Sequence, residues 1–173
     1  MNETMKTILE RRSTRSFSNK LVSEDILKDL VDAAMHAPSG MCRKTWKFTV
    51  VSNKEIIERL TRVIEKVLDR PGYDMYRPVA LIIPSNLRDS KYGREDNACA
   101  LQNIFLAAES YGVGSVWINQ LTGICDEPEV RAILKEMEIP DDHIVYGIAA
   151  LGYANPDAPK PVYKEIGEIK FIK

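Results

Sequence analysis

The apolar residues of this chain recur at two spacings, one typical of helices and one typical of strands. Helical spacing predicts five helices, over about residues 4–11, 24–37, 53–68, 96–111 and 128–137. Runs rich in β-branched and aromatic residues predict strands at 46–51, 79–83, 115–118 and 143–151. This order of elements predicts an α+β or α/β sandwich with few strands and several long helices.

Local signals set the ends of several elements. Ser23 is a suitable N-cap for the second helix, and Pro38-Ser39-Gly40 ends it. Ser52-Asn53-Lys54-Glu55 has the capping-box pattern, which predicts the start of the third helix. The run 79–83 is apolar at every position and stops before Pro84, as expected for a strand covered on both faces.

The fourth helix is apolar almost all round between Ala98 and Ala108. Such a helix is buried on every side, which predicts either a central layer or a subunit interface. Gln102 and Asn103 would then need hydrogen-bond partners. From Asn155 the chain is rich in Pro and Lys, and 169–172 is suited to adding a strand to another sheet, including that of a partner.

Composition narrows the class of protein. The 173 residues are enough for one domain, and 45% apolar with 28% charged residues is ordinary for a globular protein. The net charge of −1 gives no basic field for nucleic acid or an anionic membrane, so any anion site must be local.

The sequence shows neither a targeting segment nor a cysteine pattern typical of disulfides or zinc sites. We find no signal-type apolar run and nothing near the ~18 apolar residues of a membrane span, so we expect a cytoplasmic protein. Cys42, Cys99 and Cys125 are odd in number and widely spaced, which predicts reduced thiols and no zinc site. His36 and His143 have no ligand spacing and are interpreted as structural.

The most cationic segment is Arg11-Arg12-Ser13-Thr14-Arg15-Ser16-Phe17, where the first helix ends. A guanidinium donates two hydrogen bonds to a phosphate, and a neighbouring serine hydroxyl can add a third. The segment is therefore a candidate phosphate site. The alternative is that these cations offset the negative C-terminal dipole of the preceding helix, an effect of ~0.3–1 kcal/mol.

No common nucleotide motif is present. There is no Walker loop, and Gly112 and Gly114 follow a helix and precede a strand, the reverse of the order in a dinucleotide fingerprint. A nicotinamide cofactor would have to be held in another way.

Four segments together resemble the FMN-dependent nitroreductase family, in the same order and over nearly the whole chain. They are 11–17, Ala37-Pro38-Ser39-Gly40 before Trp46-Lys47-Phe48, Gly112 to Ile118, and Ala150-Leu151-Gly152-Tyr153. The resemblance implies an α+β fold with a central, mostly antiparallel sheet flanked by helices, in an intertwined homodimer with two FMN sites across its interface. It also implies that NADH or NADPH is the reductant and that a quinone, nitroaromatic or similar small molecule is the acceptor.

The resemblance implies one FMN-binding domain over residues 1–173, in which 155–173 is an extension that packs on the partner subunit. It assigns Arg11, Ser13 and Arg15 to the FMN phosphate and the pyrimidine side of the ring, with Arg12 beside them. Pro38, Ser39 and Gly40 resemble the loop that reaches FMN from the other subunit, where glycine permits a close approach. By itself this tripeptide would be interpreted as a helix stop.

The segment Ser115 to Gln120 resembles the segment that lies against the flavin ring in members of the family. Trp117 and Ile118 lie in it, and a backbone amide near Asn119 or Gln120 is expected to donate to flavin N5. Trp117 has two interpretations, against the flavin or in the core. Asn119-Gln120 departs from the small residues that the family often has here.

Two further departures concern FMN contacts. Cys42 stands where the family commonly has an asparagine, and a thiol is a poor hydrogen-bonding substitute. The family usually has an arginine near the C-terminus, for which Lys160 or Lys164 would substitute with less geometric control.

We therefore expect a homodimeric FMN oxidoreductase with ping-pong kinetics through flavin N5, and no catalytic side chain, because the flavin carries the chemistry. The alternative is an FMN-binding redox sensor or flavin reservoir with little turnover, which the altered loop 41–45 keeps open. A third hypothesis, a dimeric scaffold that has lost its cofactor, is disfavoured by the intact Arg11, Ser13 and Arg15.

Overall fold

The computed structural model describes residues 1–159 and 167–173. Its middle layer is an antiparallel sheet with the strand order β1-β2-β5-β3. A short strand, β4, pairs with the far end of β2. The strands are β1 (Trp46–Val51), β2 (Ala80–Leu87), β3 (Gly114–Ile118), β4 (His143–Ile144) and β5 (Ile148–Gly152). The predicted α+β class with an antiparallel sheet is confirmed.

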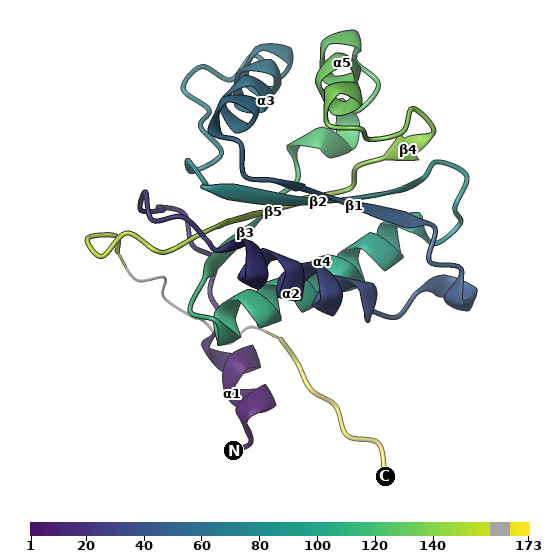
Figure 1. Ribbon diagram of the computed structural model, residues 1–173. Helices are drawn as coiled ribbons and strands as arrows, with labels where there is room; N and C mark the ends of the chain where they lie inside the picture. The colour runs from purple at the N-terminus through teal and green to yellow at the C-terminus, as the bar shows by residue number, and fades with distance from the viewer. Residues whose placement is uncertain (160–166) are drawn as a thin grey trace.

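Helices cover both faces of the sheet (Figure 1). One face carries α2 (Glu24–Met35) and α4 (Gly93–Ser110), and the other carries α3 (Lys54–Val67) and α5 (Pro128–Glu136). The first helix, α1 (Glu3–Glu10), projects from the α2/α4 side, and the last described residues leave the body on that side too. Short 3₁₀ turns occupy Gly40–Cys42 and Gln120–Gly123. Among the described helices, none is long and apolar enough to cross a membrane.

The continuous apolar run of β2 is explained by its place between two cores. Leu81 and Ile83 pack with residues of α3 and α5, whereas Ala80 and Ile82 pack with residues of α2 and α4. Because successive side chains of a strand point to opposite faces, both sets must be apolar. The prediction of a strand covered on both faces is confirmed.

The predicted end of this strand before Pro84 is wrong, because β2 continues to Leu87. On one side β2 pairs with β5 up to Ile82 and with β4 from Asn86 onward. Pro84 lies between these two partners, where the ladder is already interrupted and its missing N–H is tolerated.

Two other boundaries differ from the sequence prediction. The side chain of Asn53, rather than Ser52, caps α3 by accepting a hydrogen bond from Ile56 N at 3.1 Å. The expected strand 143–151 is two strands, because β4 and β5 pair with different ends of β2. Between them, Val145 N donates to Cys125 Sγ at 3.4 Å instead of to a neighbouring strand.

The chain does not bury α4 on every side. Leu101, Ile104 and Phe105 are buried, whereas Gln102 is exposed and Leu106 is half-buried. Asn103 Nδ2 donates to Ala33 O of α2 at 2.9 Å, which supplies the partner that the sequence required. One strip of this apolar helix therefore remains available for contact outside the chain.

Candidate functional site

The arginine-rich turn is fastened to the outer edge of β3. Thr14 N donates to Ser115 O at 2.9 Å, and Ser13 forms a parallel bridge with Ser115. A side chain at Gly114 would lie 2.5 Å from Thr14 Oγ1, so glycine permits this close approach. Phe17 is buried and bridges to Ala154, which anchors the other end of the turn.

This turn presents uncommitted donors. Arg11 and Ser13 are half-buried and Arg15 is exposed. Within the part of the chain that the structure describes, their side chains have no hydrogen-bond or ion-pair partner. Two guanidiniums and one hydroxyl on a fixed turn are a donor set suited to a phosphate.

Arg12 is engaged differently from the other arginines of the turn. Its Nη1 donates to Leu9 O at 2.6 Å and to Arg11 O at 2.8 Å. It therefore satisfies carbonyl groups at the C-terminal end of α1, where a cation also offsets the helix dipole. For this residue the structure shows the helix-end role, and its place among the cofactor contacts stays a prediction.

The Pro38-Ser39-Gly40 loop is held by α4. Gly40 N donates to Asp96 Oδ1 at 2.7 Å, and a side chain at Gly40 would overlap the ring of Tyr92. Glycine is thus required here by a contact within the chain, whatever approaches from outside. Pro38 is exposed, and Ser39 Oγ accepts from Lys44 N at 2.9 Å.

The residues after this loop have an unusual backbone. Met41, Cys42 and Lys44 have φ values of 55°, 55° and 47°, in the left-handed region that non-glycine residues rarely adopt. Cys42 is exposed. The departure from the family pattern at 41–45 therefore coincides with a strained segment.

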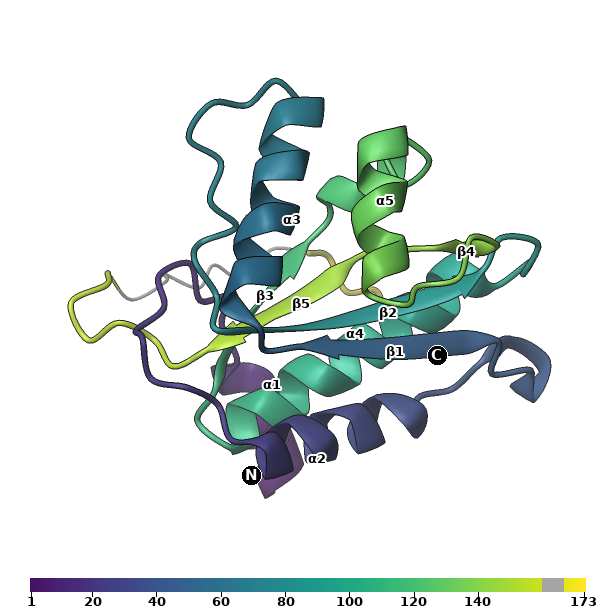
Figure 2. The same ribbon diagram turned by 45° about the horizontal axis from the view of Figure 1, so that its top comes forward.

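The arginine turn and the 38–42 loop lie at opposite ends of the sheet (Figures 1 and 2). The turn is beside Gly114, which pairs with Gly152 near the start of β2, whereas Thr45 contacts Asn86 near its end. The stretch of β2 from Ala80 to Asn86 spans roughly 20 Å. One chain therefore does not bring these two predicted parts of the site together.

Trp117 and Ile118 differ in what they offer. Ile118 is 2% exposed, so its side chain belongs to the core and only its backbone is available. Trp117 is 38% exposed, its ring packs at 6.2 Å from that of Phe105, and its Nε1 donates to Asn119 Oδ1 at 3.2 Å. Both interpretations of Trp117 stay open, because its ring packs on Phe105 on one side and is partly exposed on the other.

Of the two backbone amides predicted to face a flavin, Asn119 and Gln120, that of Asn119 already has a partner. Asn119 N donates to Gln120 Oε1 at 3.0 Å, and Thr122 Oγ1 donates to Asn119 Oδ1 at 3.2 Å. A ligand that takes the Asn119 N–H must displace the Gln120 side chain, which then becomes free to contact that ligand.

Several residues near these segments make contacts that the sequence did not predict. Asp96 and Tyr92 hold the 38–42 loop. Arg94 lies over the ring of Tyr146 at 5.4 Å, and Tyr146 O accepts from Thr122 Oγ1 at 2.9 Å. The sequence carries one signal for Asp96, which is an acid in the first turn of a helix whose centre is largely apolar.

Two predicted cofactor contacts cannot be placed in this geometry. Lys160 and Lys164 lie outside the described residues.

Comparison with known proteins identifies the family. The sequence profile of the nitroreductase family matches residues 8–80 and 72–153. A crystal structure of a nitroreductase with bound FMN from Bacteroides fragilis is 37% identical, covers 100% of both chains and has a TM-score of 0.91. A nitroreductase with bound FMN from Desulfitobacterium hafniense is 26% identical, covers 98% of this chain and 100% of its own, and has a TM-score of 0.83.

A curated relative extends this similarity. The FMN reductase (NADPH) of Bacillus subtilis is 27% identical over 93% of this chain and 70% of its own length. The profile match covers most of the chain, from the arginine turn to the end of β5. The resemblance seen in the sequence is confirmed, and the chain belongs to the nitroreductase family.

Proposed function

We propose that this protein is an FMN-dependent oxidoreductase that takes electrons from NADH or NADPH and reduces a quinone, nitroaromatic or similar small acceptor. The observation that carries the proposal is the uncommitted donor set of Arg11, Ser13 and Arg15 on a turn fixed to β3. The relatives named above as FMN-bound nitroreductases and as an FMN reductase support it.

The residues present fit FMN in charge and in hydrogen bonding. Arg11, Ser13 and Arg15 would hold the phosphate and the pyrimidine side of the ring, and the backbone amide of Asn119 or Gln120, just after β3, would face the ring. Ser115 and Asn119 lie roughly 13 Å apart along the strand, so the site is elongated. When bound, FMN supplies hydride transfer at N5 and two-electron reduction.

The chain's own groups would favour that chemistry by their charge. Fixed guanidiniums next to the ring stabilise negative charge that develops on reduction, without reorganisation at the moment of transfer. The exposed ring of Trp117 would form one wall of the substrate pocket. We propose that reductant and acceptor use this pocket in turn, which gives ping-pong kinetics.

We propose that the active form is a homodimer in which the 38–42 loop of one subunit completes the site of the other. The support is that this loop and the arginine turn lie at opposite ends of the sheet within one chain. Several apolar side chains are also exposed to solvent. The helix α1 has no buried residue, and the exposed apolar residues near the two ends of the chain include Met5, Ile8, Leu9, Ile169, Phe171 and Ile172. The uncovered strip of α4 is on the same side of the sheet.

The C-terminal extension fits this arrangement. Residues 167–173 run away from the body on the side of α1 (Figure 1). We propose that residues 155–173 pack on the partner subunit, and that 169–172 provides apolar contacts there. We also propose a cytoplasmic location, supported by the free thiols of Cys42, Cys99 and Cys125.

A second candidate function is a redox sensor or flavin reservoir with little turnover. Two observations favour it: the strained segment Met41 to Lys44 and the engagement of the Asn119 amide by Gln120. Both features lie outside the arginine turn, so the proposed contacts of Arg11, Ser13 and Arg15 to the phosphate would remain.

An absorption spectrum of the purified protein, recorded before and after anaerobic addition of NADH or NADPH, separates these functions. Flavin bands that bleach within seconds support the oxidoreductase. Flavin bands that persist support the sensor or reservoir. A colourless protein that does not take up added FMN contradicts both.

A further inference from the structure

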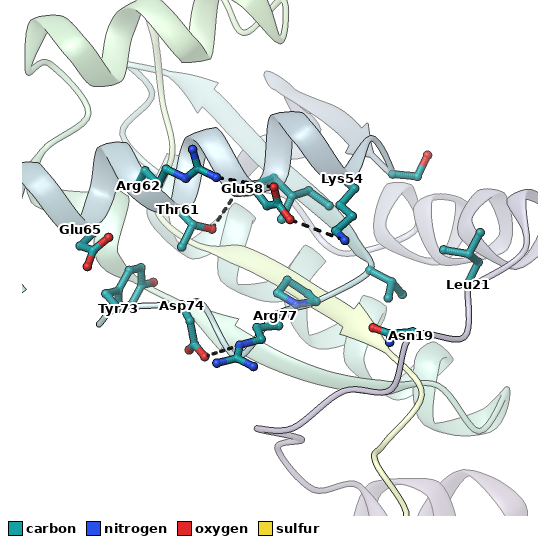
Figure 3. Close-up of a pocket in the computed structure, with 14 residues that line it drawn as sticks. Asn19, Leu21, Lys54, Glu58, Thr61, Arg62, Glu65, Tyr73, Asp74 and Arg77 are labelled. Atoms are coloured by element: carbon teal, nitrogen blue, oxygen red, sulfur yellow. Dashed lines mark hydrogen bonds and ion pairs between the residues drawn. The ribbon is translucent and has the colours of Figure 1, made fainter. Parts of the chain in front are cut away.

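The cleft between α3 and the segment 69–79 is lined by charges that pair with one another (Figure 3). Lys54 and Arg62 both approach the carboxylate of Glu58. On the opposite wall, Arg77 Nε donates to Asp74 Oδ2 at 3.1 Å. This balanced lining selects no ligand by its charge. The outer edge of β3 differs, because it carries an exposed aromatic ring whose position is fixed by its neighbours.

That ring is the indole of Trp117, which lies along the stretch of β3 between the two ends of the proposed FMN site. β3 is the last strand in the order of the described sheet, and the arginine turn bridges to it at Ser115. Because side chains alternate along a strand, Ser115 and Trp117 point to the same face, roughly 7 Å apart. A ligand that reaches from the arginine turn to Asn119 therefore passes the indole.

Gly147 makes room for the indole. A side chain at this buried position would lie 2.6 Å from Trp117 Nε1 and 2.7 Å from Trp117 Cε2. The φ of Gly147 lies outside the left-handed region, so its backbone does not require glycine. The missing side chain is therefore required by the position of the indole.

Two further contacts fix the orientation of the ring. Phe105 of α4, which is buried, packs on the indole with the ring centroids 6.2 Å apart and the planes tilted by 52°. Asn119 Oδ1 accepts a hydrogen bond from Trp117 Nε1 at 3.2 Å, and Thr122 Oγ1 contacts the same oxygen at 3.2 Å. The indole is thus held at its Nε1 edge, while 38% of the residue remains exposed.

We propose that Asn119 and Gly147 are positioning residues that hold the indole of Trp117 as a fixed surface on which a flat conjugated ring stacks. A ring that is already fixed loses little conformational freedom on binding, and offset stacking of two rings is favourable beyond the area that it buries. The isoalloxazine of FMN and an aromatic or quinoid acceptor are the two sources of such a ring in this site. The inference rests on the proposed function and names the part of the ligand that Trp117 recognises.

The position of the ring is measured first, on the full-length chain. The sequence has two tryptophans, so two indole N–H signals are expected in ¹H–¹⁵N NMR spectra, and Trp46→Phe assigns them. Asn119→Ala and Gly147→Ala should both move the Trp117 signal. Asn119→Asp, which keeps an oxygen acceptor, should move it less than Asn119→Ala. Gly123→Ala is the control and should leave it unchanged, since a methyl there meets nothing within 4 Å.

Binding of the flat ring is measured separately for its two sources. The dissociation constant of FMN comes from fluorescence quenching, and the KM comes from reduction of 1,4-naphthoquinone. Asn119→Ala should raise one of these constants by about threefold or more. A weaker affinity for FMN assigns the stacked ring to the flavin, whereas a raised KM with unaltered FMN binding assigns it to the acceptor. In a Trp117→Leu background, Asn119→Ala should have no further effect, because it acts through the indole.

The proposal is overturned if the Trp117 signal does not move in Asn119→Ala, or if it moves while both constants keep their values. An equal effect of Asn119→Ala with and without Trp117 also overturns it. Failure of the unmodified chain to bind FMN contradicts the proposed function, whereas equal constants in the unmodified chain and in Asn119→Ala contradict only the positioning role.

Discussion

The backbone N–H of Gly40 donates a hydrogen bond of 2.7 Å to the carboxylate of Asp96, which is only 4% exposed. This bond joins residues 56 positions apart and fastens the 38–42 loop to the first turn of α4. The loop proposed to complete the partner's site is therefore positioned by a buried acid.

Asp96→Ala is expected to destabilise the protein by about 1–3 kcal/mol, because it leaves the Gly40 N–H without its acceptor. Urea unfolding measures the change. Glu95→Ala is the control, since Glu95 is the exposed neighbour of Asp96 on the same helix. Equal stability of the two variants would show that the bond contributes little.

Gly40→Ala is expected to cost about 1–3 kcal/mol, because the added methyl would overlap the Tyr92 ring. The double variant Gly40→Ala/Tyr92→Ala should recover part of this loss relative to Tyr92→Ala alone, as measured by urea unfolding. Gly123→Ala is the control, since a methyl there meets nothing within 4 Å. Additive losses in the double variant would contradict the steric explanation.

Arg15→Ala is expected to weaken FMN binding by about tenfold or more, equivalent to about 1.4 kcal/mol, through loss of a charge-assisted contact to phosphate. Quenching of FMN fluorescence on binding gives the dissociation constant. Arg70→Ala, which removes an arginine far along the chain from the turn, should leave it unchanged. An unaltered constant for Arg15→Ala would remove Arg15 from the site.

His143 makes stability depend on pH. It is buried, its Nδ1 lies 3.0 Å from Ser85 Oγ, and burial lowers its pKa below the ordinary 6.5. Asp142 and Ser85 oppose this shift, while Lys47 and Arg131 add to it. Below pH 6.5 the unfolded chain binds a proton that the folded chain does not, so the free energy of unfolding falls as pH drops from 6.5 to the lowered pKa.

Urea unfolding at a series of pH values between neutrality and about pH 5 measures this effect. His143→Gln should flatten the dependence over that window. His36→Gln should retain it, because His36 is exposed. If both variants keep the full dependence, His143 is not its source.

Tyr73→Phe is expected to stabilise the protein by about 1 kcal/mol, because the Tyr73 hydroxyl is buried without a hydrogen-bond partner among the described residues. The same burial raises the pKa of the phenol. Tyr111→Phe should do the opposite, since it removes a hydrogen bond of 2.5 Å to Asp29 Oδ2. Thermal unfolding of both variants measures the contrast, and a loss of stability in Tyr73→Phe would contradict the prediction.

The sequence alone determined the parts of this fold that depend on neighbouring residues. Ser23 is predicted to cap α2, and its side chain does accept from Ile26 N. The apolar run of β2 indicates a strand between two covered faces, as found. The family is also evident, because its four segments are local patterns in a fixed order.

Tertiary structure decided what each polar group of the candidate site contacts. Arg12 and Arg15 look alike in the sequence, yet only Arg12 is committed to carbonyls of α1. Pro84 is expected to end a strand, but the change of partner from β5 to β4 allows β2 to continue through it. The Gly40–Asp96 bond joins segments distant in sequence. Such contacts depend on how the helices pack on the sheet. Local sequence patterns do not predict these contacts, because the free energy that favours them comes from the assembled fold.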